Sequence, residues 1–126
     1  MKNTGDNKVE DCLLQVADLT LNMRTAVVHR AGKEITLSMT EYKLLLMLMV
    51  NADTILTRKD ITTEIWRSTP KQTGNNVEVY ISYLRNKIDR GHRQKLITTI
   101  RGSEAGYLIS TSDVQTKITR TARVSV

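Results

Sequence analysis

The sequence predicts an α+β fold in which a four-stranded antiparallel sheet precedes three helices and a C-terminal β-hairpin. Three observations support this order. Short β-rich runs separated by turn residues fill positions 13–37. Three segments with a helical spacing of apolar residues follow, and two of them begin with a Ser or Thr that has an acidic residue three positions later. Apolar runs at positions 96–100 and 106–108 flank a turn that contains glycine, which is typical of a hairpin.

The N-terminal sheet is predicted from four short segments. Residues 19–23 alternate apolar and polar side chains, the period of a half-buried strand. Residues 31–33 supply a turn, because Gly32 is free to take a positive φ. The other three strands are expected at residues 13–16, 26–29 and 34–37.

The first helix is predicted from residue 39 to about residue 51. Ser38 and Glu41 have the spacing of a capping box, in which each side chain accepts from the backbone N–H of the other residue. The helix is apolar nearly all round, which is typical of a central, buried helix. Its methionines are interpreted as core packing. The apolar positions are Tyr42, Leu44, Leu45, Leu46, Met47, Leu48, Met49 and Val50.

A short extended segment, residues 54–57, leads into the second helix. Thr57 is the expected N-cap and Asp60 the third helical position. The apolar side chains on its inner side are Ile61, Ile65 and Trp66. Residues 67–74, with Pro70 and Gly74, are predicted to be a loop.

The third helix is predicted over residues 75–88, with Asn75 as its cap. Apolar residues spaced by four, three and four positions define a buried stripe. That stripe consists of Val77, Ile81, Leu84 and Ile88. The residues expected away from it are Glu78, Val79, Ser82, Tyr83 and Asn86.

Length and composition are consistent with one domain. We expect residues 1–11 to be a flexible leader or linker, residues 12–110 the folded domain and residues 111–126 a tail. No apolar run reaches the roughly 18 residues of a membrane span, and the N-terminus lacks the apolar segment of a signal peptide. Cys12 is the only cysteine, which excludes an intrachain disulfide and fits a reducing cytoplasm.

Positive charge is concentrated in the second half of the chain. Residues 1–50 hold six Lys or Arg and six Asp or Glu, so the net charge of +6 arises in residues 51–126. Between Arg85 and Arg101 there are six cations against Asp89 alone. A basic patch of this kind indicates an anionic partner, although a solvated surface face is the alternative interpretation.

These elements and several motifs together resemble the winged helix-turn-helix DNA-binding domain of OmpR/PhoB-type response regulators, the transcription factors of bacterial two-component systems. The resemblance covers about residues 13–110. It is carried by residues 37–45 at the first helix, 56–61 with Trp66 at the second, 76–81 with 84–88 at the third, and 96–102 with 106–107 at the hairpin. It implies that the third helix enters the DNA major groove and that the hairpin is a wing.

By this resemblance, the base-contacting residues of the third helix are Asn75, Asn76, Val79, Ser82 and Tyr83. Asn can form paired hydrogen bonds with adenine, and Val79 can pack on a thymine methyl group. The alternative for Val79 is a core contact. Arg101, in the wing, can insert into a narrow minor groove.

Cations around the end of the third helix suit phosphate oxygens. The expected phosphate contacts are Arg85, Lys87, Arg90, Arg93, Lys95, Thr99 and Tyr107. Tyr107 is expected to pack at the base of the hairpin with only its hydroxyl in reach of DNA. A further segment resembles the family's RNA polymerase contact, with a simple connector as the alternative; it comprises Arg67, Ser68, Thr69, Pro70 and Lys71.

The sequence departs from the family pattern in the wing and in the third helix. The turn between Arg101 and Tyr107 is two residues longer than usual and carries Glu104, which would be repelled by phosphates. Asn75, Ser82 and Tyr83 stand where several family members have Arg. Full regulators of the family also have an N-terminal receiver domain with a phosphorylated Asp. Nothing in residues 1–12 could be that domain, so we expect an isolated effector domain or a small protein regulated in another way.

Other classes of function are disfavoured. His29 and His92 have no Cys, Ser or carboxylate partner at a catalytic spacing, and no metal-ligand cluster or cofactor motif is present, so an enzyme is not expected. RNA binding is disfavoured because Phe is absent and the four Tyr are not clustered. A winged helix that binds protein remains the alternative to a cytoplasmic regulator that binds double-stranded DNA as two copies.

Overall fold

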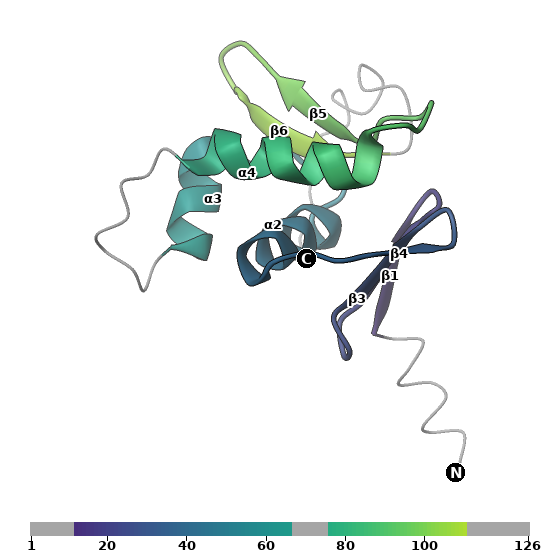
Figure 1. Ribbon diagram of the computed structural model, residues 1–126. Coiled ribbons are helices and arrows are strands. Elements are labelled where there is room, and N and C mark those ends of the chain that lie inside the picture. The colour runs from purple at the N-terminus through teal and green to yellow at the C-terminus, as the bar shows by residue number, and fades with distance from the viewer. Residues whose placement is uncertain (1–11, 67–75, 111–126) are drawn as a thin grey trace.

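The computed structural model describes residues 12–66 and 76–110, and the side chain of Asn76 lies outside the described part. Figure 1 shows the N-terminal sheet at one end of the helices and the hairpin at the side of α4 opposite α2. The elements are β1 (Leu13–Val16), β2 (Leu19–Asn22), β3 (Val27–Arg30), β4 (Lys33–Ile35), α2 (Met39–Val50), α3 (Arg58–Ile65), α4 (Asn76–Leu84), a π-helical turn η1 (Arg85–Asp89), β5 (Ile97–Ile100) and β6 (Gly106–Ile109).

The four predicted N-terminal strands are confirmed as one antiparallel sheet in the order β1-β2-β3-β4. The predicted turn is confirmed as well: Gly32 has a φ of 80°, and Ala31 before it has a φ of 54°. Leu21 pairs with Val28, and both side chains are buried on the inner face of the sheet. The sheet therefore covers one part of the core with its apolar face and exposes its polar face.

Helix α2 begins with the predicted capping box. The Glu41 N–H donates to Oγ of Ser38 over 3.2 Å, and the Ser38 N–H donates to Oε1 of Glu41 over 2.9 Å. The predicted central position of the helix is confirmed, because most of its apolar side chains are in the core or pack against it. The burial is incomplete, however: Met39 is 66% exposed and Val50 44% exposed. Only one side of α2 is covered by the sheet and the other helices, and the periodicity of a uniformly apolar helix cannot show which side.

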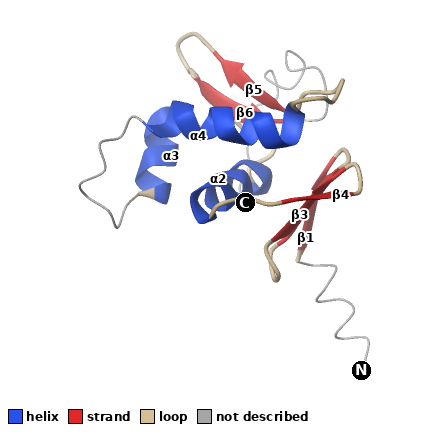
Figure 2. Cartoon of the chain, in the orientation of Figure 1, coloured by secondary structure: helices blue, strands red, loops and turns tan. Residues whose placement is uncertain are grey.

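The hairpin is joined to the middle of the chain just before α3. Leu56 and Tyr107 exchange backbone hydrogen bonds of 2.8 Å and 2.9 Å, so the predicted extended segment makes a single β-bridge. Thr57 and Asp60 then form the predicted capping box of α3. Gly106 permits this approach, because a Cβ atom there would lie 2.3 Å from the Leu56 carbonyl oxygen. The bridge places β6 against the helices (Figure 2).

The buried stripe of the third helix is confirmed. The side chains of Val77, Ile81, Leu84 and Ile88 are all at most 1% exposed. The helix differs from the prediction at its C-terminal end, where α4 stops at Leu84 and the chain continues through the π-helical turn η1 to Asp89. A π turn adds a residue to the helical repeat, and the apolar spacing does not reveal it.

Candidate nucleic-acid interface

The exposed face of α4 carries three of the predicted base-contacting residues. Ser82 is exposed, Val79 is 43% exposed and Tyr83 is 47% exposed. The alternative role of Val79 as a core residue is therefore wrong. Asn75 and the side chain of Asn76 lie outside the described residues. The face thus combines a small apolar side chain, a hydroxyl and an aromatic ring at positions that face away from the core.

Tyr83 is supported by an aromatic contact that the sequence did not predict. The ring of Tyr80 is half-buried, and its centroid lies 5.4 Å from that of Tyr83 in an edge-to-face arrangement. On its other side, Tyr80 lies 6.0 Å from Trp66 at the C-cap of α3. Edge-to-face pairs at this separation are attractive. The contacts restrain the Tyr83 ring on the exposed surface.

Arg85 links α4 to the hairpin. Its Nη2 donates to Oγ1 of Thr99 over 2.6 Å, and its Nε lies 3.4 Å from the Ile97 carbonyl oxygen. Two predicted phosphate contacts, Arg85 and Thr99, are therefore held together at the base of the hairpin. Arg101 follows β5 directly and is exposed. The hairpin turn also exposes Glu104.

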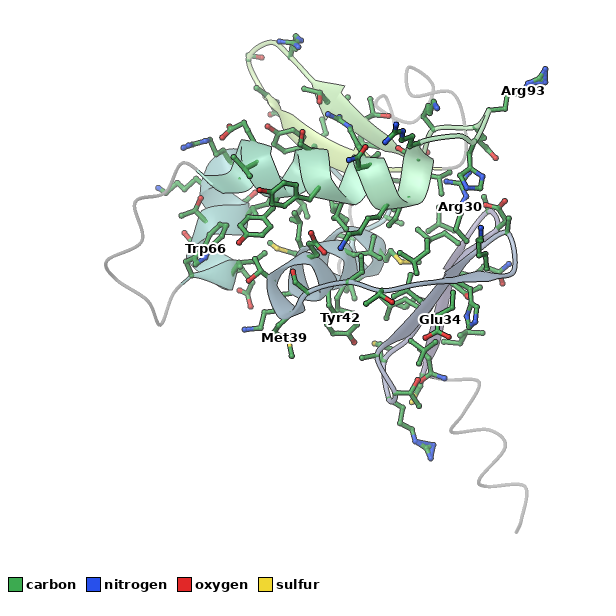
Figure 3. The ribbon with its side chains drawn as sticks, in the orientation of Figure 1. Arg30, Glu34, Met39, Tyr42, Trp66 and Arg93 are labelled. Atoms are coloured by element: carbon green, nitrogen blue, oxygen red, sulfur yellow. The ribbon has the colours of Figure 1, made fainter. Side chains whose placement is uncertain are left out.

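The remaining cations among the predicted phosphate contacts differ in how many hydrogen bonds they make within the protein. Nζ of Lys87 donates to Oε1 of Glu41 over 2.6 Å and to the Thr36 carbonyl over 3.1 Å. Lys95 donates to the Asp89 carbonyl over 3.1 Å. Arg93 points away from the body of the molecule (Figure 3). Arg90 is also exposed, and its Nη1 lies 3.5 Å from Oδ1 of Asn86. Arg90 and Arg93 are therefore more available to an external anion than Lys87.

An open basic hollow lies between α4 and the hairpin. Its volume is about 390 Å³, and its lining includes three cations, Arg85, Arg90 and Lys95, against the single anion Asp89, together with Ser82. A hollow with several cations concentrates positive potential, which attracts phosphate oxygens. The structure thus brings predicted base and phosphate contacts from α4, the loop after it and the hairpin to one surface.

Tyr107 and Glu78 line a second hollow, which also includes Arg58 and Arg101. Tyr107 is only 9% exposed, which agrees with its predicted packing at the hairpin base. Burial raises the pKa of Tyr107, and the nearby Glu78 carboxylate raises it further. Arg58 Nε donates to Glu78 Oε2 over 2.9 Å, and this hydrogen bond holds the pKa of Glu78 below its ordinary value. The carboxylate on the first turn of α4 is therefore ionised and offset by a cation.

A buried ion pair behind the exposed face was not predicted. Arg30 in β3 and Asp89 at the end of η1 are 2% and 4% exposed, with Nη1 3.2 Å from Oδ1. The one available signal in the sequence was Asp89 itself, the lone anion in a run of cations. Without the fold, its partner could not be identified.

Within the described ranges, 12–66 and 76–110, no group of three or more His, Cys, Asp or Glu side chains is placed to hold a metal ion. The same residues include no helix long and apolar enough to cross a membrane.

Comparisons with known proteins agree on one family. The family model described as "Transcriptional regulatory protein, C terminal" matches residues 32–109. Response regulator MprA of Mycobacterium tuberculosis is 38% identical over 104 residues, which are 82% of this chain and 44% of MprA, so the chain spans less than half of that relative. The response regulator DrrB, described as a Thermotoga maritima OmpR/PhoB homolog, has a TM-score of 0.68 and 27% identity over 79% of this chain and 44% of DrrB. The RstA DNA-binding domain of Klebsiella pneumoniae, solved in complex with the RstA box, has a TM-score of 0.67 and 25% identity over 79% of this chain and 98% of that domain.

Proposed function

The chain belongs to the OmpR/PhoB-type family of DNA-binding transcriptional regulatory domains, and from this premise we propose that it binds double-stranded DNA in a sequence-specific manner. In the proposed complex, α4 enters the major groove and the hairpin lies at the adjacent minor groove. A helix fits the major groove, where each base pair presents a distinct pattern of donors, acceptors and methyl groups.

The observation that carries the proposal is the position of the exposed face of α4 beside the basic hollow. Val79, Ser82 and Tyr83 are all exposed on α4, and Ser82 also lines the hollow. Base edges and phosphates lie side by side in a duplex, so a reader of sequence needs both kinds of surface next to each other. A solvated basic surface without a partner would not require exposed apolar side chains beside its cations.

Each side chain has a proposed part in that complex. Val79 packs on a thymine methyl group, while Ser82 and Tyr83 contact base edges together with Asn75 and Asn76. Arg101 enters the minor groove. The backbone contacts come from Arg85, Lys87, Arg90, Arg93, Lys95, Thr99 and the hydroxyl of Tyr107.

The proposal includes further partners. Two copies would bind half-sites about one helical turn apart, because neighbouring domains must reach the same side of the duplex. Residues 67–71, which lie outside the described residues, would contact RNA polymerase. The domain would act in the bacterial cytoplasm as a regulator and not as an enzyme.

Selection of DNA from a pool of genomic fragments tests the proposal. The chain should retain a subset of fragments that share a motif, and gel-shift titration should show that the affinity falls with added salt, since binding releases counterions. Failure to retain any duplex, or retention of all fragments alike, would exclude sequence-specific binding.

The same experiment separates DNA binding from the alternative, a winged helix that binds protein. The alternative is favoured by one observation, the exposed apolar residues Met39 and Val50 of α2. Variants Met39→Ser and Val50→Ser should leave DNA retention unchanged if α4 and the hairpin are the binding surface. Loss of DNA binding in these variants would place the interface on α2.

A further inference from the structure

Arg30 is a buried cation at the end of β3 and lies outside the surface proposed to face DNA. A guanidinium is costly to bury unless its donors are paired. Its Nη1 donates to the Ile88 carbonyl over 2.8 Å and to Oδ1 of Asp89 over 3.2 Å, and Nη2 donates to the Gln94 carbonyl over 2.8 Å. Nε lies 2.7 Å from Oδ1 of the exposed Asp18 carboxylate, an ion-pair contact without hydrogen-bond geometry. One side chain thus joins the N-terminal sheet to the end of the DNA-reading helix and to the loop that follows it (Figure 3).

Asp89 continues this connection into the hairpin. Its Oδ1 accepts from the Leu96 N–H over 2.9 Å, and its Oδ2 accepts from the Ile97 N–H over 3.1 Å. Ile97 is the first residue of β5. The two carboxylate oxygens therefore hold the start of the hairpin at the carboxyl end of the helix, while Arg30 holds the carboxylate.

The π-helical turn η1 explains how Asp89 reaches its position. The Arg90 N–H donates to the Arg85 carbonyl over 2.9 Å, one residue further back than in an α-helix. Ile88 and Asp89 are consecutive and both buried. The carbonyl of Ile88 also belongs to the helix end, where acceptors lack intrahelical donors, and Arg30 supplies one.

We propose that Arg30 is a positioning residue for DNA binding and that, through Asp89, it sets the orientation of the hairpin relative to α4. This inference rests on the proposed function. Contact with two adjacent grooves requires α4 and the hairpin to keep one relative orientation. Residues 90–96 are the covalent connection between them. Hydrogen bonds from Ile88 before this connection, from Gln94 and Leu96 near its end, and from Ile97 after it converge on Arg30 and Asp89. Arg suits the position because its planar fork donates from separate nitrogens to acceptors on different sides, whereas all three donors of Lys are on one nitrogen.

The test compares Arg30→Lys with Arg24→Lys. Both variants make the same change and keep the charge, and Arg24 is an exposed residue between β2 and β3. Affinity is measured for a duplex selected by the natural chain, at a temperature where circular dichroism confirms the fold. Residual dipolar couplings of backbone amides give the angle between α4 and the hairpin. Asp89→Asn is a second variant. It replaces the carboxylate that accepts from Arg30, Leu96 and Ile97 by an amide of the same shape.

We expect Arg30→Lys and Asp89→Asn to change the angle and to weaken binding by about 5- to 100-fold, the effect of losing one base contact. Arg24→Lys should match the natural chain in both measurements. An unchanged affinity, or a loss of affinity without a change of angle, would overturn the positioning role. If the natural chain retains no duplex, the proposed function falls and this inference with it; if the natural chain binds and Arg30→Lys binds equally well, only the inference falls.

Discussion

Val79 is an apolar residue on the exposed surface of a helix whose other aliphatic side chains are buried. It is 43% exposed, while Val77, two positions earlier, is 0% exposed. An exposed valine gains stability only when a partner covers it. The proposed partner is a thymine methyl group. Thymine and uracil differ only in this methyl group, so the contact can be tested by exchanging one base for the other.

Replacement of the contacted thymine by deoxyuridine should weaken binding by about 0.8 kcal/mol, the value of one buried methyl group. With Val79→Ala, the same replacement should cost clearly less, because the methyl group no longer has its apolar contact. Titration of both duplexes with both proteins gives the coupling. Thr25→Ala, an exposed change in the turn after β2, should keep the full effect of the methyl group. Equal costs for the natural chain and Val79→Ala would remove Val79 from the base contacts.

Lys87 and Arg93 are both proposed phosphate contacts, but they differ within the protein. The ammonium group of Lys87 is bonded to Glu41 and to the Thr36 carbonyl, whereas Arg93 points away from the body. Each change to Ala should flatten the dependence of log K on log salt by about one unit and weaken all sequences alike. Only Lys87→Ala should also lower the unfolding temperature. A loss confined to one sequence would contradict the phosphate role.

Among the elements, the hairpin depends most on a close backbone approach. Gly106 faces the Leu56 carbonyl with no room for a Cβ atom. Gly106→Ala should therefore destabilise the protein by about 1–3 kcal/mol, as overpacking typically does, and should weaken DNA binding by displacing β6. Chemical denaturation measures the first effect and gel shift the second. Ser103→Ala, in the exposed turn, is the matched control. A stability equal to that of the control would show that the bridge to Leu56 can be released without cost.

The Glu41 carboxylate connects the start of α2 to the end of the DNA-reading helix, because it accepts hydrogen bonds from both Ser38 and Lys87. Burial alone would raise the pKa of Glu41, but hydrogen bonds from Lys87 and Ser38 lower it below its ordinary value of 4.5. A carboxyl group with a depressed pKa in the folded state stabilises the fold above its unfolded pKa. That contribution is lost as the pH falls through the folded pKa.

Glu41→Gln should therefore lower the free energy of unfolding at neutral pH and make its decline below about pH 4.5 shallower. The cost at neutral pH should be about 1 kcal/mol, because the ion pair with Lys87 is lost while Gln can still accept from the Ser38 N–H. Urea denaturation at several pH values measures both effects. Glu34→Gln removes an exposed carboxylate from β4 and should leave the acid decline nearly as steep. A parallel shift of the whole curve in Glu41→Gln would mean that the carboxylate does not contribute to acid unfolding.

At the scale of the whole molecule, the sequence predicted the features that depend on near neighbours. Two capping boxes and the turn at Gly32 were correct because each involves residues within three or four positions. The buried stripe of the third helix was correct because its spacing is periodic. The exposed side of α2 was missed, since an apolar pattern all round carries no information about which side is covered.

The sequence predicted which residues of the candidate site are exposed, but not the long-range contacts that hold the site in place. The positions of Val79, Ser82 and Tyr83 follow from their distance to the buried stripe. The contact between Lys87 and Glu41 joins residues 46 positions apart, and that between Arg30 and Asp89 joins residues 59 positions apart. No local pattern encodes such pairs. In the sequence, Asp89 could only be counted as one anion among six cations, whereas in the fold it anchors the hairpin.

The long span of the Arg30 contacts also has a consequence for the order of folding. The bonds from Arg30 to Ile88 and Gln94 close loops of 58 and 64 positions, and such loops close late because their entropy must be lost before the contact forms. Helices and the small hairpins of the sheet can form earlier from local contacts. We therefore expect the wing to reach its final place in the last step of folding, so that a partly folded chain would carry a DNA-reading helix without its wing.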